Sequence, residues 1–288
     1  MKPSPFIGVI NCTDAFLMKN SLVLLFVAAL LLANPFDCWG AAGDRQQCQW
    51  TVDGESRTAV IKPAEKTGVG PAPLVFGWHG HGGTATGCER WGLEALWPEA
   101  IFVYAQGLPT PGRLTDPEGK KSGWQAQSGV MKDRDLKLFD TILADLRGKF
   151  SIDEKRIYST GHSNGGGMTY LLAEQRPGVF AAIAPCASAK LRRGASGNPI
   201  PVLHVLGEND PLVKPEWQYS TIETVKQINQ CTRDPVSWGD SGALSALMYQ
   251  SGNGSPLVVA THRGGHEYPK GAAELIVRFF KEQSLHKK

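Results

Sequence analysis

The segment Gly161-His162-Ser163-Asn164-Gly165 holds a serine in the pattern G-x-S-x-G. A strand-like run, residues 156–160, precedes it, and an apolar helical run, residues 168–173, follows it. Strand, sharp turn and helix are the context in which such a serine is exposed on a strained backbone. The two glycines are needed because a side chain at either position would collide with the strand or the helix. The segment therefore predicts that Ser163 is a nucleophile.

A serine hydroxyl is a weak nucleophile at neutral pH, so Ser163 needs a base and the base needs an orienting acid. Asp210 follows the predicted strand 202–206 and stands directly before a proline. His266 follows the predicted strand 257–260 and two glycines. The order serine, acid, histidine is that of the α/β-hydrolase fold. We predict a triad in which His266 is the base and Asp210 holds its ring.

Other residues compete for these roles. His204 lies inside an apolar strand, which favours a hydrogen-bonded histidine of the core. His262 is closer than His266 to the end of its strand, but lacks the paired glycines in front. Glu208 and Asp240 are alternative acids, on the approach to a turn and in an apparent surface turn.

The oxyanion of an acyl-transfer intermediate needs preorganised N–H donors. Asn164 can offer its backbone N–H at the start of a helix. The glycine-rich loop 79–83 resembles the loop that supplies the second donor in esterases, and we predict the backbone N–H of His81 for this role.

A metal site at His79 and His81 is a rival interpretation of the same loop. Neither an aspartate-histidine cluster nor an H-E-x-x-H helix accompanies these histidines. The predicted chemistry requires no metal and no organic cofactor.

The remaining pattern predicts how these loops are positioned. Apolar strand-like runs alternate with helical runs, which indicates an α/β fold with a mostly parallel central sheet and helices on both faces. The expected strands are residues 73–78, 100–104, 156–160, 180–185, 202–206 and 257–260, and the expected helices are 136–150, 168–173, 216–228 and 275–280. Segment 106–129 lacks periodicity, and loops of that length are typical of functional sites.

The N-terminus predicts export. The apolar run 22–33 is too short to span a bilayer and suits the core of a signal peptide. Small residues favour cleavage after Ala42, so residues 1–42 are the expected signal peptide and 43–288 a single catalytic domain, with Met18 as an alternative start. We expect a secreted protein, extracellular or periplasmic, without a membrane anchor after cleavage.

Cysteines and charge give two further expectations. Cys48, Cys88, Cys186 and Cys231 would remain in the exported chain, where they permit two disulfides in three connectivities. The 288-residue chain has a net charge of +3 and no stripe of lysine and arginine, so nucleic acid is not an expected partner.

Several blocks of the sequence together resemble one family. The chain resembles secreted poly(3-hydroxybutyrate) depolymerase-like esterases, which overlap the feruloyl and acetylxylan esterases of carbohydrate esterase family 1. The matching blocks are Trp78-His79-Gly80-His81-Gly82-Gly83, residues 152–166, residues 180–185, residues 207–211 and Gly265-His266-Glu267-Tyr268-Pro269. The resemblance implies a serine esterase with the triad Ser163, Asp210 and His266, and a pocket-lining role for Trp124.

The substrate is less well specified. The expected substrate is an ester, either linked to polysaccharide or part of a polyester fragment. A feruloyl or related carbohydrate esterase ranks above a polyhydroxybutyrate depolymerase, because no separate aromatic-rich binding module is present. A hydrolase fold that binds carbohydrate without catalysis, and acyl transfer to an acceptor other than water, are the alternatives.

Overall fold

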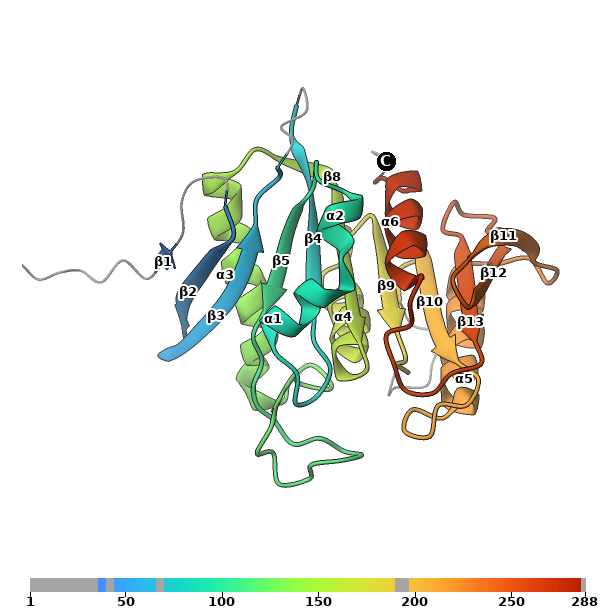
Figure 1. The fold of residues 1–288 in the computed structure, drawn as a ribbon, viewed down its shortest axis with the longest axis horizontal. Helices are drawn as coiled ribbons and strands as arrows, with labels where there is room; N and C mark the ends of the chain where they lie inside the picture. Colours follow the sequence, from blue (N-terminus) through green and yellow to red (C-terminus); the bar gives the residue numbers. More distant parts are fainter. Residues whose placement is uncertain (1–35, 40–43, 66–69, 190–196, 286–288) are drawn as a thin grey trace, which may run out of the picture. The chain divides into compact units, whose positions relative to one another are not determined.

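An eleven-stranded sheet runs through the part of the chain that the computed structural model describes, residues 36–39, 44–65, 70–189 and 197–285 (Figure 1). In sheet order its strands are β1 (Phe36–Trp39), β2 (Gln46–Val52), β3 (Glu55–Lys62), β5 (Ile101–Ala105), β4 (Ala72–Trp78), β8 (Ile152–His162), β9 (Ala182–Cys186), β10 (Val202–Gly207), β13 (Leu257–His262), β12 (Leu244–Tyr249) and β11 (Val236–Ser241). A second, two-stranded sheet joins β6 (Leu108–Pro109) and β7 (Ser122–Gly123) inside the long loop.

The centre of the large sheet is parallel, from β5 through β4, β8, β9 and β10 to β13. Both edges are antiparallel, with β1 to β3 on one side and β11 and β12 on the other. The predicted parallel sheet is confirmed for the six central strands. The edge strands were not predicted, because strands such as β2 and β12 alternate between buried and more exposed residues and so lack the continuous apolar runs of strands covered on both faces.

Helices cover both faces of the sheet, as predicted (Figure 1). They are α1 (Ala85–Cys88), α2 (Leu93–Leu96), α3 (Arg134–Lys149), α4 (Asn164–Gln175), α5 (Pro215–Ile228) and α6 (Ala272–Glu282). One core contains buried residues of α3, α4 and α5, and the other contains those of α1, α2 and α6. Adjacent strand residues supply opposite cores, as with Phe76 and Val75 of β4, because side chains alternate across a strand.

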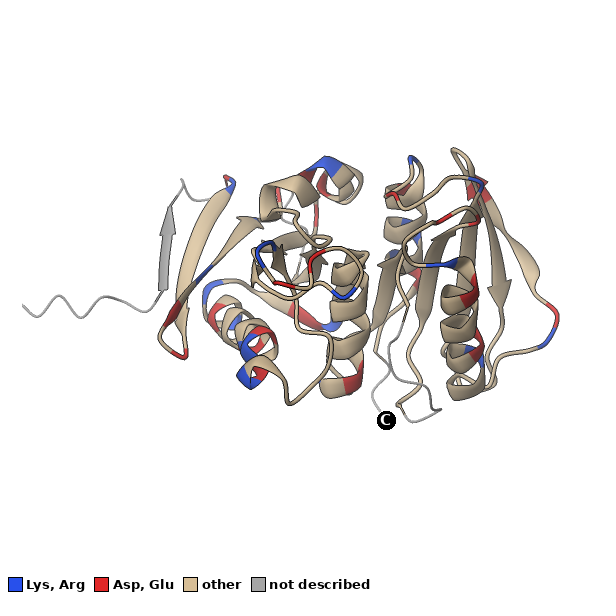
Figure 2. Cartoon of the chain, turned by 90° about the horizontal axis from the view of Figure 1, so that it is seen from below, with Lys and Arg blue, Asp and Glu red and all other residues tan. Residues whose placement is uncertain are grey.

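Charged residues of both signs are interspersed over the outer helices and loops (Figure 2). Several form ion pairs at the surface, including Arg147 with Glu154 at 2.6 Å and Arg176 with Asp140 at 2.6 Å. In the described ranges, no helix combines the length and apolar character needed to cross a membrane.

The cysteines correct one expectation. Cys88, Cys186 and Cys231 are free thiols, so the predicted pair of disulfides among the four cysteines of residues 43–288 is wrong. Cys48 is disulfide-bonded. Burial raises the pKa of both Cys88 and Cys186, which keeps these thiols protonated and unreactive.

The predicted signal segment and its cleavage site fall largely on residues 1–35 and 40–43, which lie outside the described residues. Strand β1 is described and pairs antiparallel with β2, with Cys38 opposite Cys48 in the register. Cleavage after Ala42 would remove this strand from the sheet.

Candidate active site

Ser163 occupies the turn between the end of β8 and the start of α4. Its backbone has φ 55° and ψ −118°, a conformation that side chains rarely adopt and that persists only where surrounding contacts enforce it. The N–H of Ser163 donates to the carbonyl of Cys186 at the end of β9, at 2.8 Å. The strained serine turn predicted from the sequence is therefore present.

The two glycines of the turn are sterically required. A β-carbon on Gly165 would overlap the backbone carbonyls of Trp78 and His79, at the end of β4. A β-carbon on Gly161 would overlap the backbone of Gly165. The prediction that side chains at these positions would clash with neighbouring backbone is confirmed.

Ser163, His266 and Asp210 form one hydrogen-bonded chain. The Ser163 hydroxyl lies 2.8 Å from Nε2 of His266, and Nδ1 of His266 lies 2.8 Å from Oδ2 of Asp210. With Nδ1–H donating to the carboxylate, Nε2 is free to accept the serine proton. The Asp210 side chain is fully buried and that of His266 is 14% exposed, so this row of hydrogen bonds leads from the interior toward solvent.

The Asp210 carboxylate is fixed by further donors. Its Oδ1 accepts the backbone N–H groups of Leu212 and Val213, both at 2.9 Å. Its Oδ2 also accepts the side-chain amide of Gln218 at 3.3 Å. These donors satisfy a buried charge and aim one oxygen at His266.

Gln218 connects the acid to His204 in the core. Its Oε1 accepts from Nε2 of His204 at 3.2 Å, and the hydroxyl of Tyr170 donates to Nδ1 of the same ring at 2.7 Å. Burial lowers the pKa of His204 to about 4, so this ring is neutral at physiological pH. The prediction that His204 is a hydrogen-bonded core residue is confirmed.

The rival residues lie elsewhere. His262 is buried at the end of β13, and its Nδ1 accepts the backbone N–H of Gly264 at 3.1 Å. Glu208 and Asp240 are both exposed, and Asp240 belongs to the edge strand β11. Among the described residues, none of the three has a hydrogen bond to Ser163 or His266.

His162 packs against His266, with ring centroids 4.9 Å apart. Burial, and then the neighbouring His266, lower the pKa of His162 to about 4. The neutral ring therefore adds no positive charge beside the histidine that would accept the serine proton.

The glycine-rich loop after β4 lies against the serine turn. A β-carbon on Gly80 would lie 3.5 Å from Cβ of Ser163. In the described part of the chain, the backbone N–H groups of His81 and Asn164 donate to no protein acceptor. Both stay predicted donors for an oxyanion.

The side chains of this loop are engaged in other bonds. Nε2 of His79 accepts the backbone N–H of Gly107 at 2.9 Å, and its Nδ1 donates to the carbonyl of Gly80 at 2.8 Å. Nε2 of His81 lies 3.1 Å from the carboxylate of Asp116. Over the described ranges, no group of three or more His, Cys, Asp or Glu side chains is arranged to hold a metal.

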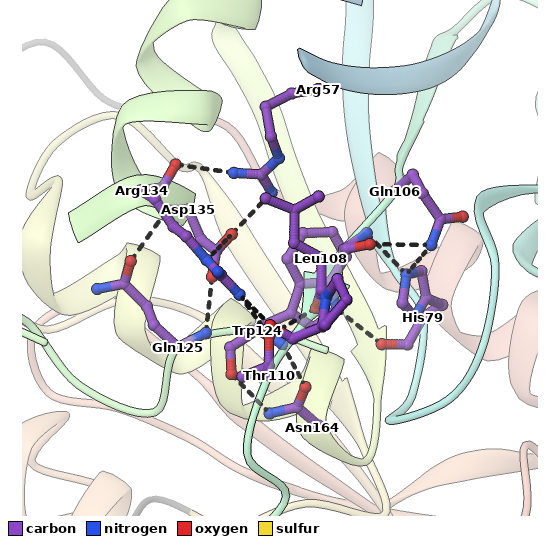
Figure 3. A network of polar contacts seen from close by, with 12 residues as sticks. Arg57, His79, Gln106, Leu108, Thr110, Trp124, Gln125, Arg134, Asp135 and Asn164 are labelled. Atoms are coloured by element: carbon purple, nitrogen blue, oxygen red, sulfur yellow. Dashed lines mark hydrogen bonds and ion pairs between the residues drawn. The ribbon is translucent and has the colours of Figure 1, made fainter. Parts of the chain in front are cut away.

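Trp124 does not line an open pocket, contrary to the expectation. Its side chain is 1% exposed, and its indole N–H donates to the carbonyl of His79 at 2.8 Å. Its backbone bonds to the side-chain amide of Asn164 (Figure 3). The residue is buried beside the serine turn because both of its polar ends find partners there.

Sequence reasoning missed the buried polar residues behind the site. They are Gln218, which supports the acid, and Arg57, Gln125 and Asp135, which lie behind Trp124. Such residue types are mostly exposed in proteins, and their spacing alone does not distinguish buried pairs from surface charges.

The sequence is similar to those of known hydrolases. Residues 123–230, which include Ser163 and Asp210, match the model of the prolyl oligopeptidase family. Feruloyl esterase C of Emericella nidulans is 28% identical over 207 residues, covering 68% of this chain and 71% of that protein. Feruloyl esterase D of Neurospora crassa is 26% identical over 232 residues, covering 75% of each.

The fold is shared with solved esterase structures. The acetyl xylan esterase from Aspergillus awamori superimposes with a TM-score of 0.62 at 14% identity, over 85% of this chain and 98% of that one. A carboxylesterase from Bacillus cereus gives a TM-score of 0.56 at 14% identity, over 78% and 94%. The chain therefore has the α/β-hydrolase fold, and the resemblance to feruloyl esterases that its motifs indicate is confirmed.

Proposed function

We propose that the protein is a serine carboxylic-ester hydrolase that acts through a covalent acyl-enzyme. The observation that carries the proposal is the chain Ser163–His266–Asp210, with both hydrogen bonds at 2.8 Å. Nucleophile, base and orienting acid are within hydrogen-bonding reach of one another, as this chemistry requires. The feruloyl esterase relatives support the same reaction.

In the first half-reaction, Ser163 Oγ forms a bond to the ester carbonyl carbon while its proton passes to Nε2 of His266. The carbonyl oxygen becomes an oxyanion, which the N–H groups of His81 and Asn164 would stabilise. The carbon–oxygen bond to the alcohol then breaks, and His266 returns the proton to the departing alkoxide. Asp210 stabilises the imidazolium throughout.

In the second half-reaction, water attacks the acyl-enzyme. His266 accepts a proton from the water as its oxygen bonds to the acyl carbon. The tetrahedral intermediate collapses, Ser163 regains its proton, and the carboxylic acid is released. Every step uses side chains and amides of this chain.

For the substrate, we propose a feruloyl or related carbohydrate ester, ahead of a 3-hydroxybutyrate polyester. The relatives named feruloyl esterase favour this order. We also propose export of the protein, with the processed chain beginning at or before Phe36, because strand β1 pairs with β2. N-terminal sequencing of the exported protein tests that boundary, and a first residue after Ala42 would refute it.

The test of function is hydrolysis of methyl ferulate, p-nitrophenyl acetate and a 3-hydroxybutyrate oligomer by the wild type and by Ser163→Ala. We expect serine-dependent turnover with a preference for methyl ferulate. Preference for the oligomer would move the assignment to polyester. Carbohydrate binding without turnover of any ester would indicate a carbohydrate-binding protein instead of an enzyme.

A further inference from the structure

We propose that Trp124 is a positioning residue that sets the relative placement of the two oxyanion-binding N–H groups. The inference rests on the proposed function, since it concerns the hydrolysis of an ester at Ser163. Trp124 would act without touching the substrate, because its side chain is 1% exposed.

Trp124 is bonded to both sides of the serine turn. On one side, its backbone N–H donates to Oδ1 of Asn164 at 2.7 Å, and its carbonyl accepts from Nδ2 of Asn164 at 3.1 Å. On the other side, its indole N–H donates to the carbonyl of His79 at 2.8 Å. Asn164 carries one predicted oxyanion donor, and His79 opens the loop that carries the other.

Trp124 thus forms a bridge between Asn164 and the loop 79–83, and close packing limits the movement of this bridge. The indole of Trp124 meets the indole of Trp78 edge to face at a centroid distance of 5.0 Å, and lies 4.9 Å from the ring of His79. A β-carbon on the preceding Gly123 would overlap the ring of His81 and Oδ1 of Asn164. The segment that carries Trp124 therefore fits tightly between His81 and Asn164.

A buried ion pair anchors the bridge to the body of the fold (Figure 3). Gln125, directly after Trp124, donates its backbone N–H to Oδ2 of Asp135 at 2.7 Å and accepts the Asp135 N–H on its side chain at 3.0 Å. Arg57 of β3 contacts Oδ1 of the same carboxylate at 2.7 Å, and both charged side chains are fully buried. Trp124 is thus linked through Gln125 to a network of hydrogen bonds and an ion pair that spans β3, the long loop and α3.

This placement matters mainly for the transition state. Oxyanion donors work when they lie about 2.7–3.1 Å from the position of the developing negative oxygen. Without the indole bond, the carbonyl of His79 loses its partner, and the loop bearing His81 is no longer tied to Asn164. Ground-state binding of the ester would change little, whereas stabilisation of the oxyanion would fall.

The chain offers a matched pair of variants. Trp124→Phe and Trp50→Phe each replace a buried indole with a smaller ring and remove one indole N–H donor. Trp50 lies in β2, and its indole donates to Oδ2 of Asp145 at 3.1 Å, so its loss leaves Trp124 and the bond to His79 in place. Packing defects would appear in both variants, whereas misplacement of the oxyanion donors would appear only in Trp124→Phe.

The experiment measures kcat and KM for p-nitrophenyl acetate and the inhibition constant of an alkyl trifluoromethyl ketone, whose serine adduct carries an oxyanion. For Trp124→Phe we expect kcat to fall roughly 10- to 100-fold with KM within about twofold, since misplaced catalytic groups cost that much. Ketone affinity should fall in parallel. Trp50→Phe should change kcat by less than about threefold.

Equal kcat losses in the two variants, or a loss confined to KM, would overturn the inference and assign Trp124 to packing. If Trp124→Phe does not fold, Asn164→Ala replaces it, because it keeps the backbone N–H and removes both side-chain bonds to Trp124. An unchanged kcat in Asn164→Ala would then overturn the inference. Turnover that survives in Ser163→Ala would instead refute the proposed function, independently of these results.

Discussion

The two sides of Ser163 are built in different ways. On the proton-transfer side, His266 and Asp210 are side chains on separate loops, and the ring of His266 is partly open to solvent. On the oxyanion side, the expected donors are backbone amides, and the side chains that hold them are buried. The first side depends on which residue types are present, and the second on how the backbone is supported. Substitutions on the two sides should therefore impair the protein in different ways.

The largest effect is expected from Ser163→Ala. The variant keeps the fold but loses the nucleophile, so kcat/KM should fall by roughly 10³-fold or more. Steady-state hydrolysis of p-nitrophenyl acetate, with thermal unfolding as the control for folding, measures this. A variant that keeps a tenth of the wild-type rate would remove Ser163 from the mechanism.

His266→Ala should approach the same loss, because Ser163 would lack its base. His262→Ala is the matched control, since His262 ends the strand that precedes His266 and has no hydrogen bond to Ser163 or Asp210 in the described structure. We expect the control to retain activity within a few-fold. The reverse result would transfer the role of base to His262.

Asp135→Ala tests whether the oxyanion side contributes more than the proton-transfer side to the free energy of unfolding. It would leave Arg57 buried and unpaired, which typically costs about 3–5 kcal/mol in the free energy of unfolding. Ser163→Ala should show no comparable loss. Urea unfolding of both variants provides the comparison, and equal stabilities would contradict the view that the oxyanion side depends on the buried network.

The pH dependence of stability tests the support behind Asp210. The pKa of His204 is about 4 in the fold, below the ordinary value of 6.5. Between these values the unfolded chain binds a proton that the folded chain does not, so stability falls as pH decreases. The loss from this residue between pH 7 and pH 5 should be about 2 kcal/mol.

Urea unfolding of the wild type and His204→Gln at both pH values measures that contribution. The variant should be less stable at pH 7, because a buried hydrogen bond is altered, and less sensitive to pH. His162, with a pKa also near 4, leaves a residual pH dependence in the variant. Identical pH dependence in both proteins would show that His204 does not remain neutral in the fold.

The residues of the proton-transfer side were predictable from the sequence, whereas the support of the oxyanion side was not. Ser163, Asp210 and His266 each follow an apolar strand in an order typical of one fold, so local pattern and chain order locate them. Arg57 and Asp135 are far apart in the chain, and their pairing depends on how α3 packs against the sheet. Local sequence carries no signal for that packing.

Trp124 illustrates the same limit. Its resemblance to a pocket-lining tryptophan predicted exposure to substrate, whereas the residue is buried and its indole N–H donates to the carbonyl of His79, a contact that local sequence does not indicate. The prediction missed the edge strands for a related reason, since strands that alternate between buried and more exposed residues have weak apolar patterns. The sequence therefore predicts the residues of the site better than the contacts that hold them.

The most direct test of the central claim is to trap the acyl-enzyme. The wild type and Ser163→Ala are mixed with p-nitrophenyl acetate, quenched with acid within the first turnovers, digested and analysed by mass spectrometry. We predict an acetyl group on Ser163 in the wild type, and no acylated residue that accounts for turnover in the variant. Acylation of a different residue that persists in Ser163→Ala together with turnover would contradict the account.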